Sequence, residues 1–594
     1  MARKHIPAEI SRRQKSSGSL PKLLLSLFFI FLFAFSVSPA FGNIGRSAYV
    51  EMLLKARGFD PAGKDALQMA LDLDLVPMFP GKPGEAVTMK EAIVCAVHSL
   101  GLSSAAEIMA DVPLPFRDGA TLTPIEKGSV AVAVNMTPPL LKKNAPSLGP
   151  ERLITSGEAG NIAAIVKAAS KKLSLYASYS PVKGMTIQFN RRGIHDRPPR
   201  WRGVVAGFET REEAELFSGS LEAEGVQSTV DSWNYDWRVR SPLFDVYGPV
   251  RKFLEAAEGL GRRGTVFSSP ANWNTAGGPW FWVMITLDPA KFFLRPIVAP
   301  GGLSALAPLS SMTYGTSAAI NGGYFSTSGK EKGAPIGVII DRGIMANPPY
   351  AGRTILGWND ENQAAFGQMD WKAEVHFADR GYMNITGINK APGEGAAILY
   401  TPHFGETTPI YPGPVAELVL EGSVCREVRR QGGNPIPPGM RVISVYGSPA
   451  RHLETLAPGD RVEIRQTVND GAPYWSPMTN AIQAGPFLLS KGVFMEDGEK
   501  LSDSVLKKRH PRSVIGLTEK GQWFFFVGDG RDAVHSVGFT LAETADILKK
   551  SGAYYALNLD GGGSSTISGE GRILNRLSDG KERPVSYGVG AFLR

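Results

Sequence analysis

The sequence predicts a multidomain protein with α-helical repeats, a small α/β module and a large C-terminal sheet-rich α+β domain. Three observations predict this. Helix-start patterns recur near the N-terminus roughly every 32 to 35 residues, and strand-like and helix-like segments alternate in the middle of the chain. From about residue 280, short apolar runs alternate with Gly, Pro, Asn and Asp turns. The chain has 594 residues, 67 Gly and 43 Pro, enough for several turn-rich domains.

Residues 1–40 have the features of a targeting segment. Six basic residues and one acidic residue precede the apolar run from Leu23 to Phe35, and the small residues of SVSPAFG follow it. This pattern is typical of a secretory signal peptide cleaved after Ala40. The alternative is an uncleaved N-terminal membrane anchor, for which the apolar run is short. In either case we expect an extracytoplasmic protein, in the cell envelope or secreted.

Charge and cysteine content exclude several classes. Most of the formal net charge of +8 lies in the leader, and no aromatic-basic motif accompanies the rest, so no nucleic-acid partner is predicted. The two cysteines, Cys95 and Cys425, fall in different predicted domains, and we expect no disulfide between them. An exported chain with so few cysteines suits a bacterial envelope protein.

Residues 44–175 are predicted to form helical repeats. Three threonines are each followed three residues later by a glutamate, which is the pattern of a capping box at a helix start. The pairs are Thr88/Glu91, Thr123/Glu126 and Thr155/Glu158. The segment resembles degenerate S-layer homology (SLH) repeats, which bind secondary cell-wall polymers. It departs from the usual arginine after the threonine, with Met89, Pro124 and Ser156 there instead. A helical spacer is the alternative.

Residues 180–265 are predicted to form the α/β module. GVVAGF indicates a strand, TREEAELFSGSLEAEGV a helix that starts at Thr210, and LFDVYG and VRKFLEAAEGLG repeat that order. The segment resembles a SPOR-type module, a fold associated with peptidoglycan glycan strands. A plain linker domain is the alternative.

Residues 280–594 are predicted to form the sheet-rich domain. RSVIGLT and QWFFFVG flank a tight turn and predict a hairpin. One strong helix is expected in LAETADILKKS, with a capping box from Thr540 and Glu543 and a stop at Gly552. The strand YYALNLD then leads directly into the glycine-rich segment NLDGGGSST.

Five separated stretches of this domain join a strand-like run to glycine and a polar or charged group. They are AAINGGYF, NAIQAGPFLL, RHPRSVIG, VGDGRDAVHSVGFT and ALNLDGGGSST. Where strand ends meet, such segments form a pocket lined by backbone N–H groups, amides, carboxylates and arginines. Glycine lets a ligand approach the backbone closely, and successive N–H groups bind anions. The pattern therefore predicts an anionic, sugar-like ligand.

Individual residues receive roles in that pocket. Asp560 and Asp529 are the candidate catalytic carboxylates, Arg512 and Arg531 can hold a phosphate, and Asn321 is expected to orient a sugar. For each aspartate, the alternative is a structural role in pinning the glycine loop. The other candidate substrate-binding residues are Gly322, Gly323, Gln483, Gly561, Gly562, Gly563, Ser564 and Ser565.

Nucleotide and metal sites are not supported by these segments. A nucleotide P-loop needs a lysine before its Ser or Thr, and here Gly563 precedes Ser564. The eight histidines show no paired spacing, so no metal site is predicted. His510 and His535 are candidate acid/base groups, with a structural role as the favoured alternative. No cofactor is predicted, and the sequence leaves a requirement for a divalent cation open.

Taken in order, the five stretches resemble the motifs of the phosphodiester glycosidase family. The resemblance covers about residues 280–594 and rests on NGGYF, DGRD, NLDGGGSST and the closing segment RPVSYGVGAFL, with residues 370–475 less similar. The best-known family member removes N-acetylglucosamine from a phosphodiester-linked cap on lysosomal enzymes, and bacterial relatives are associated with exopolysaccharide biosynthesis. The resemblance implies an α-N-acetylglucosaminidase-like hydrolase of a sugar-1-phosphodiester.

The residue chemistry agrees with that implication. Cleaving the anomeric C–O bond expels a phosphate monoester, a weak base that needs charge stabilisation more than a general acid. A carboxylate then attacks the sugar or activates water. The expected substrate is a phosphate-linked glycan or wall polymer, with the N-terminal parts as a tether. The alternative is a non-enzymatic cell-wall glycan-binding protein. The sequence does not decide the sugar, the aglycone, which aspartate attacks, or the oligomeric state.

Overall fold

The computed structural model describes residues 42–78, 81–195, 200–233, 236–269, 278–378, 380–453, 455–469, 474–495 and 497–594. The chain divides into two compact units, Met1–Ala40 and Phe41–Arg594, and every described residue belongs to the second. The signal peptide or membrane anchor predicted for residues 1–40 therefore lies outside the described residues. Among the described helices, none combines the length and the apolar character that crossing a membrane requires.

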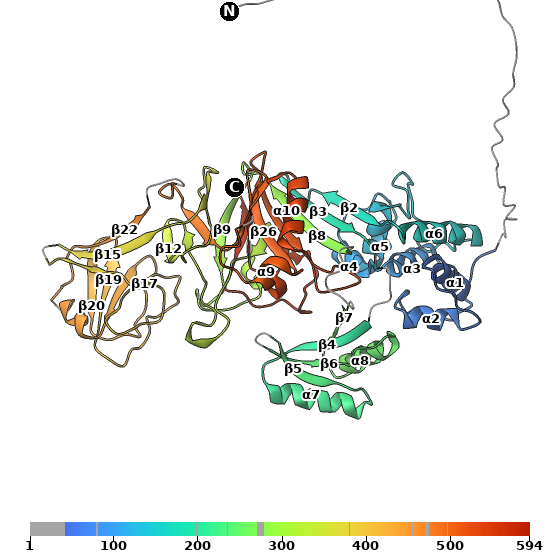
Figure 1. Ribbon diagram of the computed structural model, residues 1–594, viewed down its shortest axis with the longest axis horizontal. Helices are drawn as coiled ribbons and strands as arrows, with labels where there is room; N and C mark the ends of the chain where they lie inside the picture. The colour runs from blue at the N-terminus through green and yellow to red at the C-terminus, as the bar shows by residue number, and fades with distance from the viewer. Residues whose placement is uncertain are drawn as a thin grey trace, which may run out of the picture. The chain divides into compact units, whose positions relative to one another are not determined.

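Helices form the first part of this unit, as the helix-start patterns predict (Figure 1). The capping boxes at Thr88, Thr123 and Thr155 are all present. Gly101, with φ of +68°, follows the end of α3, where a left-handed residue is usual. The helices are α1 (Arg46–Ala56), α2 (Ala66–Asp72), α3 (Met89–Ser99), α4 (Ser103–Ile108), α5 (Pro124–Asn135) and α6 (Ser156–Ala169).

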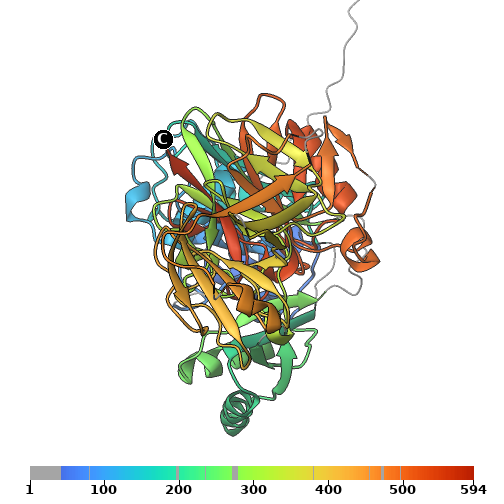
Figure 2. The same ribbon diagram turned by 90° about the vertical axis from the view of Figure 1, so that its left-hand side faces the viewer.

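The middle of the chain contains a β-α-β-β-α-β unit. Its antiparallel sheet has the order β5-β6-β4-β7. Both helices pack into one core with the sheet, through Leu221 of α7, Phe253 of α8 and Phe208 of β4 (Figures 1 and 2). The elements are β4 (Arg200–Phe208), α7 (Arg211–Ala223), β5 (Thr229–Trp233), β6 (Asp236–Arg240), α8 (Gly248–Gly259) and β7 (Thr265–Ser269).

A nine-stranded antiparallel sheet joins the N-terminal and C-terminal parts. Its order is β1-β2-β3-β8-β27-β26-β28-β24-β25. Figure 1 shows β2 and β3 continuing this sheet beside β8. The strands are β1 (Met136–Thr137), β2 (Ser174–Tyr179), β3 (Met185–Arg192), β8 (Trp280–Leu287), β24 (Phe487–Ser490), β25 (Val493–Phe494), β26 (Arg512–Thr518), β27 (Trp523–Gly528) and β28 (Ala553–Asn558).

Strand β3 lies inside residues 180–265, yet it belongs to the large sheet. Its register with β8 runs from Met185 opposite Leu287 to Arg192 opposite Trp280. Alternate residues of β3 are buried, and Phe189 packs in the same core as Phe281. The sheet of the α/β unit begins only at β4. The sequence-based boundaries thus cut through a strand pairing that no local pattern reveals.

Four further sheets complete the C-terminal part. Their orders are β30-β29-β10-β31-β9, β12-β11-β23-β13-β14, β16-β15-β22 and β17-β18-β21-β19-β20. The last two arise from residues 371–468 and share a core with part of the second of these sheets. The strands are β9 (Phe292–Val298), β10 (Ala318–Asn321), β11 (Ile339–Asp341), β12 (Ile344–Asn347), β13 (Ile355–Trp358), β14 (Ala364–Gly367), β15 (Trp371–Phe377), β16 (Tyr382–Asn384), β17 (Gly387–Ile388), β18 (Ala397–Tyr400), β19 (Val415–Glu421), β20 (Val424–Arg429), β21 (Arg441–Tyr446), β22 (Val462–Val468), β23 (Asn480–Gln483), β29 (Ile567–Gly569), β30 (Arg572–Ile573) and β31 (Tyr587–Leu593).

The predicted sheet-rich character of this part is confirmed. The hairpin pairs β26 with β27 from Arg512 opposite Gly528 to Leu517 opposite Trp523. The expected helix is α10 (Leu541–Lys550), capped by Thr540, and a short α9 (Asp503–Lys507) is the other described α-helix of this part. Strand β28 leads into the glycine loop as predicted. These elements bring strand ends to one place and so position the site.

The two cysteines are both buried free thiols. Cys95 lies in the core shared by the helices and the large sheet, whereas Cys425 lies in the core of residues 371–468. The expectation of no disulfide is therefore confirmed.

Candidate active site

All five predicted segments meet around the loop that follows β28, residues 559–566. Four contacts join the other segments to this strand end: Gly322 O accepts from Asp560 N–H (3.1 Å), Pro511 O from Gly562 N–H (3.0 Å), Gly485 O from Asn558 Nδ2 (2.8 Å), and the Arg531 guanidinium lies beside Gly562. The convergence of strand ends that the sequence suggests is thus present. It defines the candidate site.

Two positions of the loop require glycine, because a Cβ there would come too close to neighbouring side chains. Gly562 has φ of +63°, and a Cβ there would lie 2.8 Å from an Arg531 nitrogen. A Cβ on Gly563 would overlap the Asp579 carboxylate and the Arg583 guanidinium. The glycines therefore let the loop press against three charged side chains.

Asp560 is the carboxyl group at the centre of this arrangement. Burial raises its pKa above the usual aspartate range. The Ser564 hydroxyl, the Arg583 guanidinium, the Gly561 N–H and the Arg531 guanidinium act against that rise. A partly buried carboxyl with a raised pKa near two cations is typical of a functional acid or base.

An arginine-aspartate network supports one side of Asp560. Asp579 Oδ2 accepts from Arg583 Nη2 (2.7 Å) and Nε (3.0 Å), and Asp579 Oδ1 accepts from Arg531 Nη1 (3.4 Å). Burial lowers the pKa of Arg531, whereas the Asp579 and Asp560 carboxylates raise it. Arg531 itself has φ of +65°, an uncommon conformation for a side chain of this size. The network holds positive charge beside the loop, where an anionic group would be bound.

Tyr324 and Arg353 belong to the same region. Tyr324 Oη donates to Gly485 O (2.8 Å), and burial raises the Tyr324 pKa with the Asp560 charge adding to the rise. The Arg353 guanidinium stands 4.9 Å from the Tyr324 ring centroid and 5.2 Å from that of Tyr350. The sequence reasoning missed Arg353, Asp579 and Arg583 as site residues. For Arg583, its place in the RPVSYGVGAFL segment was an available signal.

The Asn321 side chain is buried, and its hydrogen bonds connect the site loop to neighbouring segments. Its Nδ2 donates to Asp560 O (2.8 Å) and Gly322 O (3.2 Å), and its Oδ1 accepts from Ser513 Oγ (2.7 Å) and Thr566 N–H (3.1 Å). Two donors and two acceptor positions are all that an amide offers. The sequence suggests that Asn321 orients a sugar. The geometry instead uses it to orient the loop that carries Asp560.

Gln483 is saturated in the same way. Its Oε1 accepts from Val338 N–H (3.0 Å) and Tyr350 N–H (2.7 Å), and its Nε2 donates to Tyr350 O (2.7 Å) and Arg353 O (2.8 Å). The side chain is fully enclosed. Gln483 therefore fixes the segment that carries Tyr350 and Arg353, and its amide has no capacity left for a substrate.

Arg512 is committed largely to backbone carbonyls. Its Nε donates to Phe539 O (2.9 Å), and its Nη2 donates to Val505 O (2.7 Å) and Lys508 O (2.8 Å). Burial lowers its pKa to about 10. Of the two arginines predicted to hold a phosphate, Arg531 therefore lies with Asp560, whereas Arg512 ties β26 to α9.

Asp529 is enclosed behind the site. Its carboxylate accepts from His535 Nε2 (2.7 Å), Arg576 N–H (2.9 Å) and Asn575 Nδ2 (3.2 Å), and it is 1% exposed. Burial lowers the pKa of His535, whereas the hydrogen bond and the charge of Asp529 act to raise it. The structural alternative considered for Asp529 fits this geometry. A carboxylate with three protein donors and no exposure is placed to hold its loop.

The two serine hydroxyl groups are also buried, and the second histidine, His510, is partly buried. Ser564 Oγ and Ser565 Oγ make no hydrogen bond of normal geometry within the described residues. Burial lowers the pKa of His510 to about 4, and its Nε2 donates to Ser504 O (3.0 Å), so it is neutral at pH 7. In the part of the chain that the structure describes, no three His, Cys, Asp or Glu side chains gather as metal ligands.

Residues outside the C-terminal part hold the loop 529–538 in place. Arg191 of β3 donates to His535 O (2.7 Å) and Val534 O (2.8 Å). Ser268 of β7 donates to Asp532 Oδ1 (2.6 Å) and accepts from Ala533 N–H (2.8 Å). Because this loop carries Arg531, the N-terminal parts contribute to the geometry of the site.

Replacing Gly563 with alanine is expected to destabilise the protein by about 1–3 kcal/mol, because the added methyl group displaces the Asp579–Arg583 pair. The matched control is Gly219→Ala in α7, where a Cβ meets nothing within 4 Å and alanine favours the helix. Chemical denaturation of both variants checks this. Equal stability of the two variants would contradict the close packing described at Gly563.

Part of this site lies in a stretch of the chain that matches a family model. Residues 415–592 match the family model described as phosphodiester glycosidase. That stretch includes Asp529, Arg531, Asp560 and Arg583 but not Asn321. The earlier part of the predicted resemblance, residues 280–414, lies outside the match.

Individual relatives resemble shorter or more distant parts. The SPbeta prophage-derived uncharacterized protein YomE of Bacillus subtilis (strain 168) is 39% identical over 80 residues, which cover 14% of this chain and 12% of that protein. A protein of Burkholderia pseudomallei K96243 described as exported has a TM-score of 0.50 at 18% identity, over 71% of this chain and 96% of its own. It shows a likeness of fold. The zebrafish N-acetylglucosamine-1-phosphodiester alpha-N-acetylglucosaminidase catalytic domain has a TM-score of 0.28 at 15% identity, over 53% and 78% of the two chains.

Proposed function

We propose that this chain is an exported hydrolase that cleaves the glycosidic bond of a sugar-1-phosphodiester. The observation that carries the proposal is Asp560, a carboxyl with a raised pKa beside Arg531 and Arg583. This group lies within the stretch that matches the phosphodiester glycosidase model. Carboxyl and guanidinium groups are the pair that this reaction needs.

The reaction consumes water and releases a free sugar and a phosphate monoester. The bond between the anomeric carbon and the phosphate oxygen breaks, and its electron pair leaves with the phosphate. Arg531 and Arg583 stabilise the negative charge on that leaving group, which needs little protonation. Asp560 in its ionised form either attacks the anomeric carbon, and water then hydrolyses the resulting glycosyl-enzyme ester to release the sugar, or takes a proton from the water that attacks directly.

A single reactive carboxyl is sufficient for this scheme. An ordinary glycosidase needs a second carboxyl group to protonate a sugar leaving group. A phosphate monoester leaves without that help, so the enclosed Asp529 is not required as an acid. In this proposal Asp529 and His535 hold the loop of Arg531, while Asn321 holds the loop of Asp560. These three are positioning residues.

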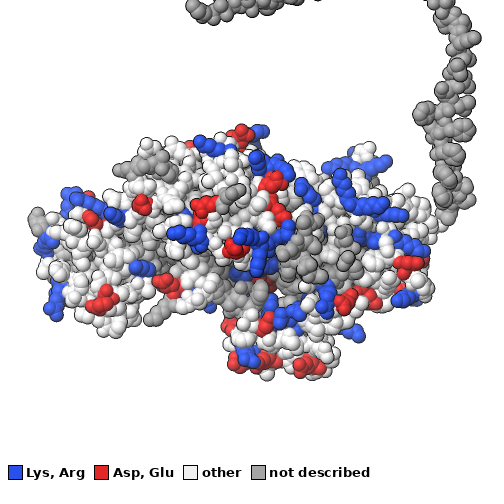
Figure 3. Space-filling view, in the orientation of Figure 1, with Lys and Arg blue, Asp and Glu red and all other residues white. Residues whose placement is uncertain are grey.

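The N-terminal parts suit a protein that works at a cell envelope. The leader pattern, the SLH-like helices and the SPOR-like α/β unit together support export and a tether on wall or surface polysaccharide. On the face in Figure 3, basic and acidic side chains are interspersed, as on a surface without a nucleic-acid role. The substrate in this proposal is a phosphate-linked glycan, with an N-acetylglucosamine unit as the first sugar to test.

The test is an assay of the purified chain with the phosphodiester α-N-acetylglucosamine 1-(methyl phosphate) and with teichoic-acid fragments. The expected result is release of free sugar and phosphate monoester in equal amounts. Release of the alcohol with the phosphate still on the sugar would show a different bond cleaved. Binding of these compounds without turnover would favour the alternative of a non-enzymatic glycan-binding protein.

A further inference from the structure

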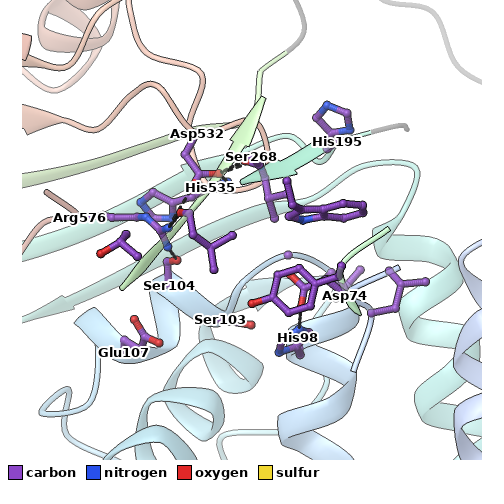
Figure 4. A pocket seen from close by; sticks show the side chains of 18 of the residues that line it. Asp74, His98, Ser103, Ser104, Glu107, His195, Ser268, Asp532, His535 and Arg576 are labelled. Carbon is purple, nitrogen blue, oxygen red and sulfur yellow. Dashed lines mark hydrogen bonds and ion pairs between the residues drawn. The ribbon is translucent and has the colours of Figure 1, made fainter. Parts of the chain in front are cut away.

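A cavity of about 840 Å³ lies where the helical part, the α/β unit and the back of loop 529–538 meet. Figure 4 shows Ser268, Asp532, His535 and Arg576 on one side of it and Asp74, His98, Ser103 and Glu107 on the other. The residues that react in the proposed function, Asp560, Arg531 and Arg583, are not among its lining. The cavity is therefore separate from the candidate active site.

Contacts between the three parts fix the walls of the cavity. Tyr247 N–H donates to Asp72 O (2.7 Å) and so ties the α/β unit to α2. Arg576 donates to Val266 O (2.8 Å) and to Ser104 Oγ, and thereby joins the C-terminal part to β7 and α4. Because the surrounding groups are bonded to each other, the cavity is preformed, as ligand sites usually are.

Several polar groups of the lining make no hydrogen bond or ion pair within the described residues. One is the Tyr247 hydroxyl, which belongs to a partly buried ring packed edge-on against Trp201, with centroids 6.0 Å apart. Burial raises the pKa of Tyr247, and the Asp74 and Glu107 carboxylates add to the rise, so this hydroxyl lies near both. These groups include the side chains of Tyr247, Ser103, Glu107 and Arg263 and the indole N–H of Trp201.

Two pairs of charged or titratable groups in the lining bond to each other. Arg576 bonds with Asp532 (3.1 Å), and His98 Nε2 bonds with Asp74 (2.9 Å). With Arg57, which donates to Ser170 Oγ (2.7 Å), the lining carries three guanidinium groups and three aspartate or glutamate carboxylates, so these formal charges balance. An anionic ligand would gain little from the cavity, because Glu107 opposes Arg263.

We propose that this cavity binds an uncharged stretch of a glycan. A sugar ring offers hydroxyl groups that both donate and accept, which matches the mixture of carboxylate, guanidinium and hydroxyl groups, and it offers an apolar face for Tyr247. The volume falls in the range of sites for ligands of several rings. This binding does not depend on the proposed hydrolysis.

The test is calorimetric titration of the full chain with three probes: the β-1,4-linked tetramer of N-acetylglucosamine, maltotetraose and glucose 1-phosphate. We expect one of the neutral tetramers to bind. Any affinity for glucose 1-phosphate is expected to be the same in the wild type and in Arg263→Ala. Tyr247→Phe removes a hydroxyl and Glu107→Gln replaces a carboxylate by an uncharged amide, and each is expected to weaken the neutral tetramer's binding about fivefold to tenfold.

Two matched variants distinguish binding in this cavity from binding elsewhere on the protein. Glu222→Gln changes an exposed glutamate on α7, outside the cavity, and is expected to leave the affinity unchanged. Asp560→Asn removes the proposed catalytic group and is also expected to leave it unchanged. Failure of both tetramers to bind at millimolar concentration, insensitivity to Tyr247→Phe and Glu107→Gln, or loss of binding in Asp560→Asn would each overturn the proposal. Because the readout is binding, absence of hydrolysis does not affect it.

Discussion

Asp560→Asn is expected to lower kcat for a sugar-1-phosphodiester by about 10³-fold, the scale of a lost acid/base group. The amide keeps the shape of the side chain but neither attacks the anomeric carbon nor takes a proton from water. The loop remains in place, because Asn321 holds it through the backbone carbonyl of residue 560. Steady-state kinetics with a synthetic phosphodiester measures the effect.

The matched control is Asp546→Asn. That carboxylate lies on α10 with its side chain 55% exposed and pairs only with Lys550 at (i, i+4). It is expected to leave kcat unchanged. Full activity in Asp560→Asn, with an unchanged fold by circular dichroism, would remove Asp560 from the reaction.

The pH profile gives a second reading of the same group. Asp560 must be ionised to react, and burial raises its pKa above the ordinary value of 3.8. The rate is therefore expected to fall as pH drops through this raised value, and Asp560→Asn is expected to lose that acid limb. A raised pKa also means that the folded state binds the proton more tightly than the unfolded chain does.

The contribution of Asp560 to the stability of the folded state is expected to change with pH in the opposite direction to the rate. The folded state gains from the protonated form below the ordinary pKa, and this gain is lost as pH rises through the raised pKa. Near neutral pH the ionised carboxylate is thus a cost to folding. Asp560→Asn is expected to unfold at the same temperature as the wild type or higher. A variant that loses activity without losing stability identifies a functional group.

A fragment that begins at residue 280 is expected to aggregate instead of folding as an independent domain. Removing β3 turns β8 into an edge strand and takes away a pairing that runs from Met185 to Arg192. The new edge is apolar, because residues 281–285 of β8 are all buried in the whole chain. Size-exclusion chromatography of residues 280–594 and of residues 42–594 measures the difference. A monodisperse fragment with the melting temperature of the longer chain would contradict the role of β3.

A point variant tests the same pairing without truncation. Phe189 of β3 is fully buried, so Phe189→Ala is expected to cost about 3–5 kcal/mol. Tyr176→Ala on β2 removes a ring that is 55% exposed and is expected to cost little. Arg191 also donates hydrogen bonds to loop 529–538. Through these bonds and the pairing of β3, the geometry of the candidate site depends on the N-terminal parts of the chain.

Several elements could be predicted because their causes are local. A capping box involves residues three apart, so Thr88, Thr155 and Thr540 mark helix starts in any tertiary context. The β26–β27 hairpin follows from two apolar runs around a tight turn. The loop after β28 follows from a strand that ends in glycine.

The roles of individual polar residues were less accessible. Residue type alone suggests a substrate-binding role for Asn321, Gln483 and Arg512, because amides and guanidinium groups suit sugars and phosphates. The structure shows their hydrogen-bonding groups engaged with protein partners, which for Asn321 and Gln483 include residues 239 and 133 positions away in sequence. Arg583 reaches the site only because β31 pairs with β10 in the sheet behind it. A residue type states what a group can bond with, but not what lies next to it.

The sequence alone determined where helices and strands begin and which five segments carry glycine beside polar groups. Those features depend on side chains close together along the chain. The tertiary structure decided that Asp560 is partly buried among arginines, that Asp529 is enclosed, and that β3 completes the active-site sheet. Burial and pairing depend on partners hundreds of residues away, such as Arg191 and His535. Asp560 is partly buried beside arginines, whereas Asp529 accepts three hydrogen bonds from protein donors, and residue type alone does not distinguish these two environments.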